Sequence, residues 1–134
     1  MTEKRVAVDG IGGVFIYAND AKALADWYAT HLGISMTTYE EGKNFGTEFK
    51  YTNLDDPKRT DATVYSIQNS PTPLASERNQ AVVNYRVRDL AGLVRQLREA
   101  GIEIEKEVDY AEYGLFAWIH DPEGNKIELY QPAG

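Results

Sequence analysis

The chain contains no cysteine among its 134 residues and only two histidines. Without cysteine it forms no disulfide, no thiolate metal site and no cysteine nucleophile, a composition compatible with a reducing cytoplasm. The N-terminal residues Met1 to Arg5 are polar, no apolar signal core follows them, and no apolar run approaches the ~18 residues that a membrane span requires. We therefore expect a cytoplasmic protein that does not enter the membrane.

Positive charge is scarce, with 14 Lys and Arg against 21 Asp and Glu and a net charge of −7. Phosphate binding requires clustered Lys and Arg, so this balance argues against a nucleic-acid partner. The acidic residues are spread along the chain, which is typical of a solvated surface. A strongly anionic ligand would need a local basic group, and Arg86 and Lys126 are the candidates.

The first half of the chain predicts one strand, one helix and then three short strands. Asp20 is a suitable N-cap, Gly33 is a suitable left-handed C-cap, and the apolar residues between them recur at helical spacing. The expected elements are a strand over residues 11–18, a helix over residues 21–32, and strands over residues 34–39, 46–51 and 62–67.

The second half repeats this order. A strand is expected over residues 81–87, a helix between Asp89 and Gly101, and an extended run over residues 102–108. Asp89 aligns with Asp20, and Gly101 aligns with Gly33 after a one-residue deletion. The sequence therefore predicts a duplicated β-α-β-β-β unit in one domain, residues 1–134. Its modules would span residues 8–70 and 79–132, and the proline-containing segment 69–79 is either a connector or a lid over a site.

A hairpin is expected at the end of the chain, over residues 114–130. The segment Asp121-Pro-Glu-Gly-Asn125 contains a proline with a fixed φ, a glycine, and side chains that hydrogen-bond to their own backbone. This combination predicts a tight turn. The expected cross-strand pairs are His120 with Lys126, Trp118 with Glu128, and Phe116 with Tyr130. One face of this hairpin is then apolar, while the other carries aromatic and charged groups and would form the floor of a site.

A pattern covering nearly the whole chain is formed by Gly13-Val-Phe-Ile-Tyr-Ala-Asn-Asp20, Leu24-Ala-Asp-Trp-Tyr-Ala-Thr-His-Leu-Gly33 and Asp121-Pro-Glu-Gly-Asn-Lys-Ile-Glu-Leu129. It resembles the vicinal oxygen chelate superfamily, which holds glyoxalase I, extradiol dioxygenases, fosfomycin-resistance proteins and bleomycin-resistance proteins. The resemblance implies an α+β fold, in which duplicated β-α-β-β-β modules curl a mostly antiparallel sheet around a cup-shaped site. It also implies a homodimer.

The ligand set of the metal-dependent members matches this sequence at one position. Members that resemble glyoxalase I carry a histidine on the first strand of a module and a carboxylate on its last strand. In this sequence the histidine position of the first module is occupied by Gly13, and that of the second module by Val82 or Val83. Only Glu128 matches a ligand position. His120 would add one more donor, still fewer than the roughly three protein ligands that a catalytic divalent site needs. We therefore expect neither a metal nor another cofactor.

Period-two alternation then assigns the side chains that would line the cup. The expected ligand-binding residues are Phe15, Tyr17, Asn84, Arg86, Phe116, Trp118, His120 and Tyr130, with Lys126 beside them. Such aromatic residues suit the capture of a small, partly flat organic molecule, whose carboxylate Arg86 would anchor. Alternatively, Arg86 and Glu128 satisfy each other as a buried ion pair, and the aromatic residues pack as core.

These observations favour a metal-independent glyoxalase-like or bleomycin-resistance-like protein that binds a small organic molecule. One alternative is a lyase or isomerase acting beside a carbonyl. In that case Glu128, if buried and unpaired, would be the general base, and Arg86 or Asn84 would steady the oxyanion. The other alternative is a metal-dependent enzyme of the dioxygenase or glyoxalase type whose ligands this pattern does not reveal.

Overall fold

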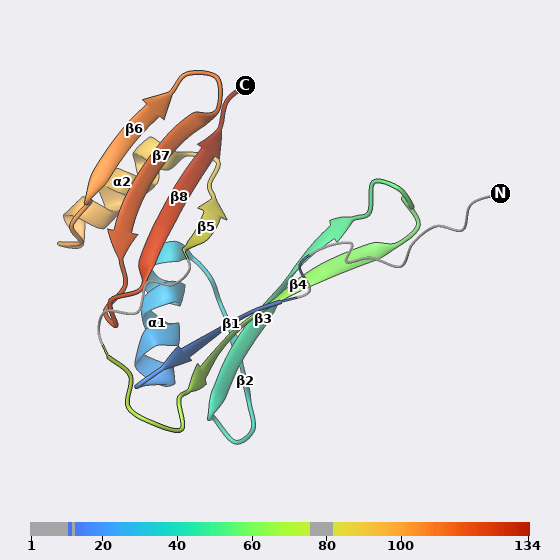
Figure 1. Cartoon of the computed structure of the whole chain (residues 1–134), viewed down its shortest axis with the longest axis vertical. Helices are drawn as coiled ribbons and strands as arrows, with labels where there is room; N and C mark the ends of the chain where they lie inside the picture. Colours follow the sequence, from blue (N-terminus) through green and yellow to red (C-terminus); the bar gives the residue numbers. More distant parts are fainter. Residues whose placement is uncertain (1–10, 12, 76–81) are drawn as a thin grey trace.

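The computed structural model describes residues 11, 13–75 and 82–134, which form two four-stranded sheets with one helix each (Figure 1). The first half, here called module 1, contains β1 (Gly13–Ala18), α1 (Ala21–Leu32), β2 (Thr37–Tyr39), β3 (Asn44–Thr52) and β4 (Thr60–Asn69). The second half, module 2, contains β5 (Val83–Arg86), α2 (Leu90–Glu99), β6 (Lys106–Tyr110), β7 (Gly114–His120) and β8 (Lys126–Pro132). The element order confirms the predicted duplication.

Both sheets have the same topology, with strand orders β1-β4-β3-β2 and β5-β8-β7-β6. In each sheet the first strand pairs in parallel with the last, and the other pairs are antiparallel. Each helix packs on one face of the sheet of its own module, where its apolar side chains meet those of the strands. The fold is therefore α+β with two open, mostly antiparallel sheets, as the sequence predicts.

The starts of both helices and the end of α1 match the residues predicted to cap them, whereas the C-cap of α2 is Ala100, one residue before the predicted Gly101. The carboxylate of Asp20 accepts a hydrogen bond from the backbone N–H of Ala23 (3.1 Å), and Gly33 ends α1 in the left-handed region at φ 71°. Asp89 accepts from the backbone N–H of Gly92 in the same way (3.0 Å). Neither helix in the described residues is both long and apolar enough to cross a membrane.

The strand bounds differ from the predicted ones: β1, β2, β5 and β6 are shorter than expected, and β3 and β4 are longer. β2 begins at Thr37 rather than at residue 34, and β6 begins at Lys106 rather than at residue 102. Ile34 is buried, and Ile102 and Ile104 pack against the core, so their apolar character reflects packing of connecting chain rather than strand pairing. Ile11 lies outside β1, which begins at Gly13. The expected strand start at residue 81 and the end of the 69–79 connector lie outside the described residues.

The two modules meet where the β7–β8 turn docks on α1 (Figure 1). Tyr28 of α1 donates its hydroxyl to the buried carboxylate of Asp121 (2.8 Å). The carboxylate of Glu123 accepts the backbone N–H groups of Asn19 (2.7 Å) and Asp20 (3.0 Å), where a helix N-terminus favours negative charge. The Asp-Pro-Glu-Gly-Asn turn therefore joins module 2 to the start of the first helix.

Candidate functional site

The face of module 2 opposite α2 carries the aromatic and charged residues predicted from the hairpin. The register of β7 with β8 pairs Phe116 with Tyr130, Trp118 with Glu128 and His120 with Lys126, as expected. β5 extends the rows by placing Asn84 beside Glu128 and Arg86 beside Tyr130. Figure 1 shows this face open, with α2 on the other side of the sheet. We call it the aromatic face.

A stack of rings occupies the middle of the aromatic face. The rings of Phe116 and Tyr130 are stacked with centroids 4.8 Å apart, and Phe116 and Trp118 are stacked at 6.0 Å. Tyr110 of β6 meets the edge of Phe116 at 5.5 Å. Phe116, Trp118 and Tyr130 are half-buried, so the rings form a rigid platform that still presents surface to a ligand.

Charged side chains surround this platform. Glu128 is half-buried and accepts a hydrogen bond from the amide nitrogen of Asn84 (3.1 Å). Glu105 contacts His120 (3.4 Å) and Lys126 (3.4 Å), and the ammonium of Lys106 lies 5.8 Å from the centre of the Trp118 ring. The described part of the chain contains no ion pair between Arg86 and Glu128, so the interpretation of a buried pair is wrong within one chain.

The remaining predicted residues lie elsewhere in the single chain. Phe15 and Tyr17 project from β1 of module 1, 55% and 51% exposed, and line a cavity of about 420 Å³ together with Lys126. Arg86 and Asn84 also line a separate cavity between the modules. Within the described residues, therefore, the predicted cup residues fall into three places rather than one hollow.

A cluster of three tyrosines lies where the two modules meet, and its member Tyr85 lines both cavities. Tyr65 and Tyr85 share a hydrogen bond between their hydroxyls (2.6 Å), and the rings of Tyr28, Tyr65 and Tyr85 lie 6.0–6.2 Å apart. Burial raises the pKa of Tyr85 to about 12 and also raises the pKa values of Tyr28 and Tyr65. These phenols stay protonated at neutral pH and act as hydrogen-bonding core between the modules.

The family model for the Glyoxalase/Bleomycin resistance protein/Dioxygenase superfamily matches residues 10–129, most of the chain. The chain belongs to this superfamily. A comparison with curated protein sequences finds no significant match. The superfamily is thus shown by the family model and by the fold.

Solved structures of superfamily-like proteins share this fold along nearly their whole length. A virulence protein from Salmonella typhimurium is 21% identical, with a TM-score of 0.69, covering 96% of this chain and 100% of its own. An antibiotic-binding protein from a Streptomyces species is 22% identical, with a TM-score of 0.69 and the same coverage of 96% and 100%. A lactoylglutathione lyase from Agrobacterium tumefaciens is 16% identical, with a TM-score of 0.62, covering 92% and 94%. At these identities the likeness concerns the fold alone.

The side chains present do not fit the metal site of the superfamily's metal-dependent members. Residues 11, 13–75 and 82–134 contain no group of three or more His, Asp or Glu side chains placed to hold an ion. Glu128 has the Asn84 amide as its neighbour, and Gly13 has no side chain to donate. A divalent cation typically needs about three protein ligands, and one chain supplies too few at this position.

Sequence reasoning missed four residues of this region. Tyr110 and Lys106 join the aromatic face from β6, and Glu105 holds His120 and Lys126. Alternation along β6 points to Tyr110 and Lys106 once their register with β7 is known, but the expected strand began too early. No local sequence pattern indicated the role of Glu123, because its hydrogen-bond partners lie more than 100 positions away along the chain.

Proposed function

We propose that this chain binds a small, flat organic molecule on the aromatic face, without a metal ion. The observation that carries the proposal is the stacked Tyr130–Phe116–Trp118 platform, half-buried rather than packed into the core. A planar ligand that extends this stack gains aromatic contact beyond its buried area, on the order of 1 kcal/mol per ring pair. The groups around the platform, chiefly Glu128, Asn84 and His120, orient the ligand by hydrogen bonding. The similar antibiotic-binding protein from Streptomyces supports a ligand-binding role for this fold.

We also propose that two copies of the chain form a homodimer that closes the cup. β1 and β5 are edge strands of their sheets, and Phe15 and Tyr17 stand more than half exposed on β1. An open edge strand offers unpaired N–H and C=O groups to another strand. A second copy that places its module 1 opposite the aromatic face would cover both surfaces and supply Phe15 and Tyr17 as the second wall.

The binding proposal is tested with Trp118 as the only tryptophan, in a Trp27→Phe background. We expect 2-naphthoate, 2-naphthol or 2-naphthylmethylamine to quench Trp118 fluorescence with saturation, and sedimentation to give the mass of a dimer. Phe116→Ala should weaken binding by about ten-fold, since a stacking contact of this kind contributes roughly 1–1.5 kcal/mol. Tyr113→Ala, in an exposed loop, is the matched control and should bind as the parent does.

Three results would contradict this proposal. The first is the absence of quenching by all three naphthalene compounds. The second is an equal loss of affinity in Phe116→Ala and Tyr113→Ala, which would mean that the platform is not the binding surface. The third is a stoichiometric amount of metal in the purified protein, which would reject metal independence. A monomeric mass would reject the dimer.

A catalytic alternative is favoured by the position of Glu128. Its carboxylate is held by Asn84 in the centre of the aromatic face, beside Trp118, where it can reach a proton next to the carbonyl of a bound ketone. If this alternative holds, the protein accelerates exchange of the α-protons of 2-tetralone in D₂O, followed by NMR. Glu128→Gln should abolish the acceleration and retain binding, and Glu105→Gln should retain both. Exchange that persists in Glu128→Gln would contradict the base role.

A further inference from the structure

A cavity of about 470 Å³ lies at the junction of the two modules, and it shares Asn84 and Arg86 with the aromatic face. Its walls come from the end of α1, the ends of β3 and β4 nearest their connecting loop, the strand β5, and α2. We call it the junction cavity. Its volume falls within the roughly 300–1,000 Å³ that is usual for small-molecule sites.

The lining of the junction cavity is apolar on most sides and cationic at one point. Leu32, Ile34, Leu93 and Leu129 form aliphatic walls. Phe49 and Tyr51 line it from β3 and are each 46% exposed, so both rings present surface to the cavity.

Arg86 is the one charged residue among the described residues that line the cavity. It makes no hydrogen bond or ion pair with another described residue. A guanidinium beside an apolar hollow is suited to a carboxylate, which it pairs through two parallel N–H donors.

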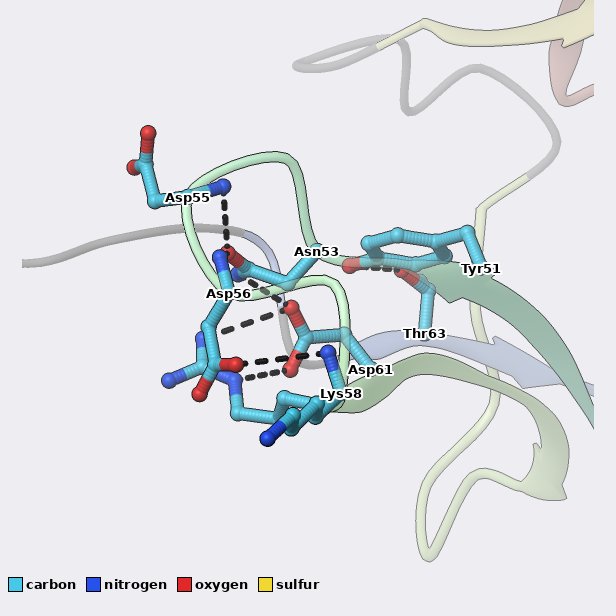
Figure 2. A network of polar contacts seen from close by, with 8 residues as sticks. Tyr51, Asn53, Asp55, Asp56, Lys58, Asp61 and Thr63 are labelled. Carbon is cyan, nitrogen blue, oxygen red and sulfur yellow. Dashed lines mark hydrogen bonds and ion pairs between the residues drawn. The ribbon is translucent and has the colours of Figure 1, made fainter.

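Two acidic side chains on strands that contribute to the cavity wall are held by other partners. Asp61 lies on the same side of module 1 as Tyr51 and Thr63, and Figure 2 shows it beside Asn53. Its carboxylate accepts hydrogen bonds from the guanidinium of Arg59 (2.8 Å and 3.3 Å) and from the amide of Asn53 (2.7 Å). Glu128 is bound by Asn84. In a chain with a net charge of −7, the cavity therefore presents a local cation to its ligand.

Two hydroxyl groups add a polar rim near the aromatic wall. The hydroxyls of Tyr51 and Thr63 lie 3.5 Å apart at the start of the β3–β4 loop (Figure 2). A ligand in the junction cavity thus meets aliphatic and aromatic surface along its body, with polar groups at the edges.

We propose that the junction cavity is a second binding site, which takes a small amphiphilic carboxylate with its apolar body in the cavity and its carboxylate on Arg86. The rings of the aromatic face, Phe116, Trp118 and Tyr130, do not line this site, although Asn84 and Arg86 border both. Because both modules contribute walls, an occupant also links them.

Titration calorimetry with decanoate, below its micelle concentration, tests the second site. We expect saturable binding of decanoate at one site per chain, and no comparable binding of decyltrimethylammonium, which has the same tail and the opposite charge. Arg86→Gln should weaken decanoate binding at least about ten-fold, the effect of losing one charge-assisted hydrogen bond. Arg95→Gln removes an exposed arginine from α2 that lines none of the cavities described above, and it should bind as the parent does.

Phe49→Ser provides a second variant at the cavity wall and should also weaken decanoate binding. The proposal is overturned if decanoate does not bind, if decyltrimethylammonium binds equally well, or if Arg95→Gln loses as much affinity as Arg86→Gln. It is also overturned if Phe49→Ser dissociates a dimer and leaves decanoate binding unchanged, because the cavity wall would then be an interface between copies.

Discussion

The carboxylate of Asp121 accepts hydrogen bonds from both halves of the chain. Within its own turn it accepts the backbone N–H groups of Glu123 (2.9 Å) and Asn125 (2.9 Å) and the side-chain amide of Asn125 (2.7 Å). Across the module boundary it accepts the hydroxyl of Tyr28. Only 5% of the surface of Asp121 is exposed. Removing its carboxylate would therefore leave these donors buried without a hydrogen-bond acceptor.

Asp121→Ala is therefore expected to destabilise the protein by about 3 kcal/mol, because a buried phenol and the turn donors lose their acceptor. Equilibrium urea unfolding, followed by far-UV circular dichroism, measures the change. Glu112→Ala, in the exposed β6–β7 loop, is the control and should change stability by less than about 0.5 kcal/mol. Similar losses in the two variants would show that the Asp121 contacts contribute little.

Single residues with a local role were predictable from the sequence. Asp20 and Asp89 cap their helices because a short carboxylate reaches N–H groups three residues ahead, which spacing alone reveals. Glu123 and the Tyr28–Asp121 bond were not predictable, because their partners are brought together only when the modules dock.

Among the elements, the β7–β8 hairpin was predicted with its register, whereas β2 and β6 were predicted too long. The hairpin has both a strong turn and strict alternation, and together these leave one way to pair the strands. In the segments before β2 and β6, apolar residues at alternate positions suggested pairing, but they pack against the core as connecting chain.

The start of β7 depends on Gly114. It adopts φ 129°, and a Cβ atom there would lie 2.1 Å from the backbone oxygen of Gln131 in β8. Since that oxygen belongs to the sheet, the strands would have to separate, and Gly114→Ala should cost about 3 kcal/mol or more. Gly33→Ala is a useful comparison, because Gly33 has φ 71° but nothing within 4 Å of the added atom. It should cost only about 1 kcal/mol.

Thermal unfolding of the two glycine variants checks this prediction. We expect Gly114→Ala to lower the melting temperature clearly more than Gly33→Ala does. Equal shifts would mean that the hairpin relaxes around a Cβ atom, and the close approach of β7 and β8 would not be essential.

At the scale of the whole molecule, the tyrosine cluster makes stability depend on pH in the alkaline range. In the unfolded chain the pKa of a tyrosine is about 10. Burial raises the folded pKa of Tyr85 to about 12, and those of Tyr28 and Tyr65 are raised as well. A raised folded pKa contributes stability that is fully present below the unfolded value and is lost as the pH rises toward the folded value. The free energy of unfolding should therefore fall between about pH 10 and pH 12.

Urea unfolding at pH 8 and pH 11 measures this loss. Tyr85→Phe removes one of the titrating groups, so the difference between the two pH values should be smaller than in the parent. Tyr113→Phe, on an exposed tyrosine, should leave the difference unchanged. An equal pH dependence in Tyr85→Phe and the parent would contradict the role of the cluster.

The arrangement of the candidate site was only partly predictable, since alternation assigns the face of each side chain but not the placement of one module against the other. It placed Phe116, Trp118, Glu128 and Tyr130 together correctly, because they share one hairpin. It also assigned Phe15 to the same cup, whereas within one chain Phe15 lies on β1, which belongs to the other sheet. The junction cavity also depends on this placement, which no local pattern encodes.

The turn at residues 121–125 carries part of the family pattern and contacts between the modules, but none of the rings of the aromatic face. It supplied much of the sequence pattern by which the superfamily could be suspected, and its carboxylates bind the start and body of α1. The rings of the aromatic face lie on the neighbouring strands and take no part in these contacts. Substitutions in these rings can therefore alter the proposed binding surface without loosening the contacts between the modules, so relatives that keep the turn can differ in this surface and still share the fold.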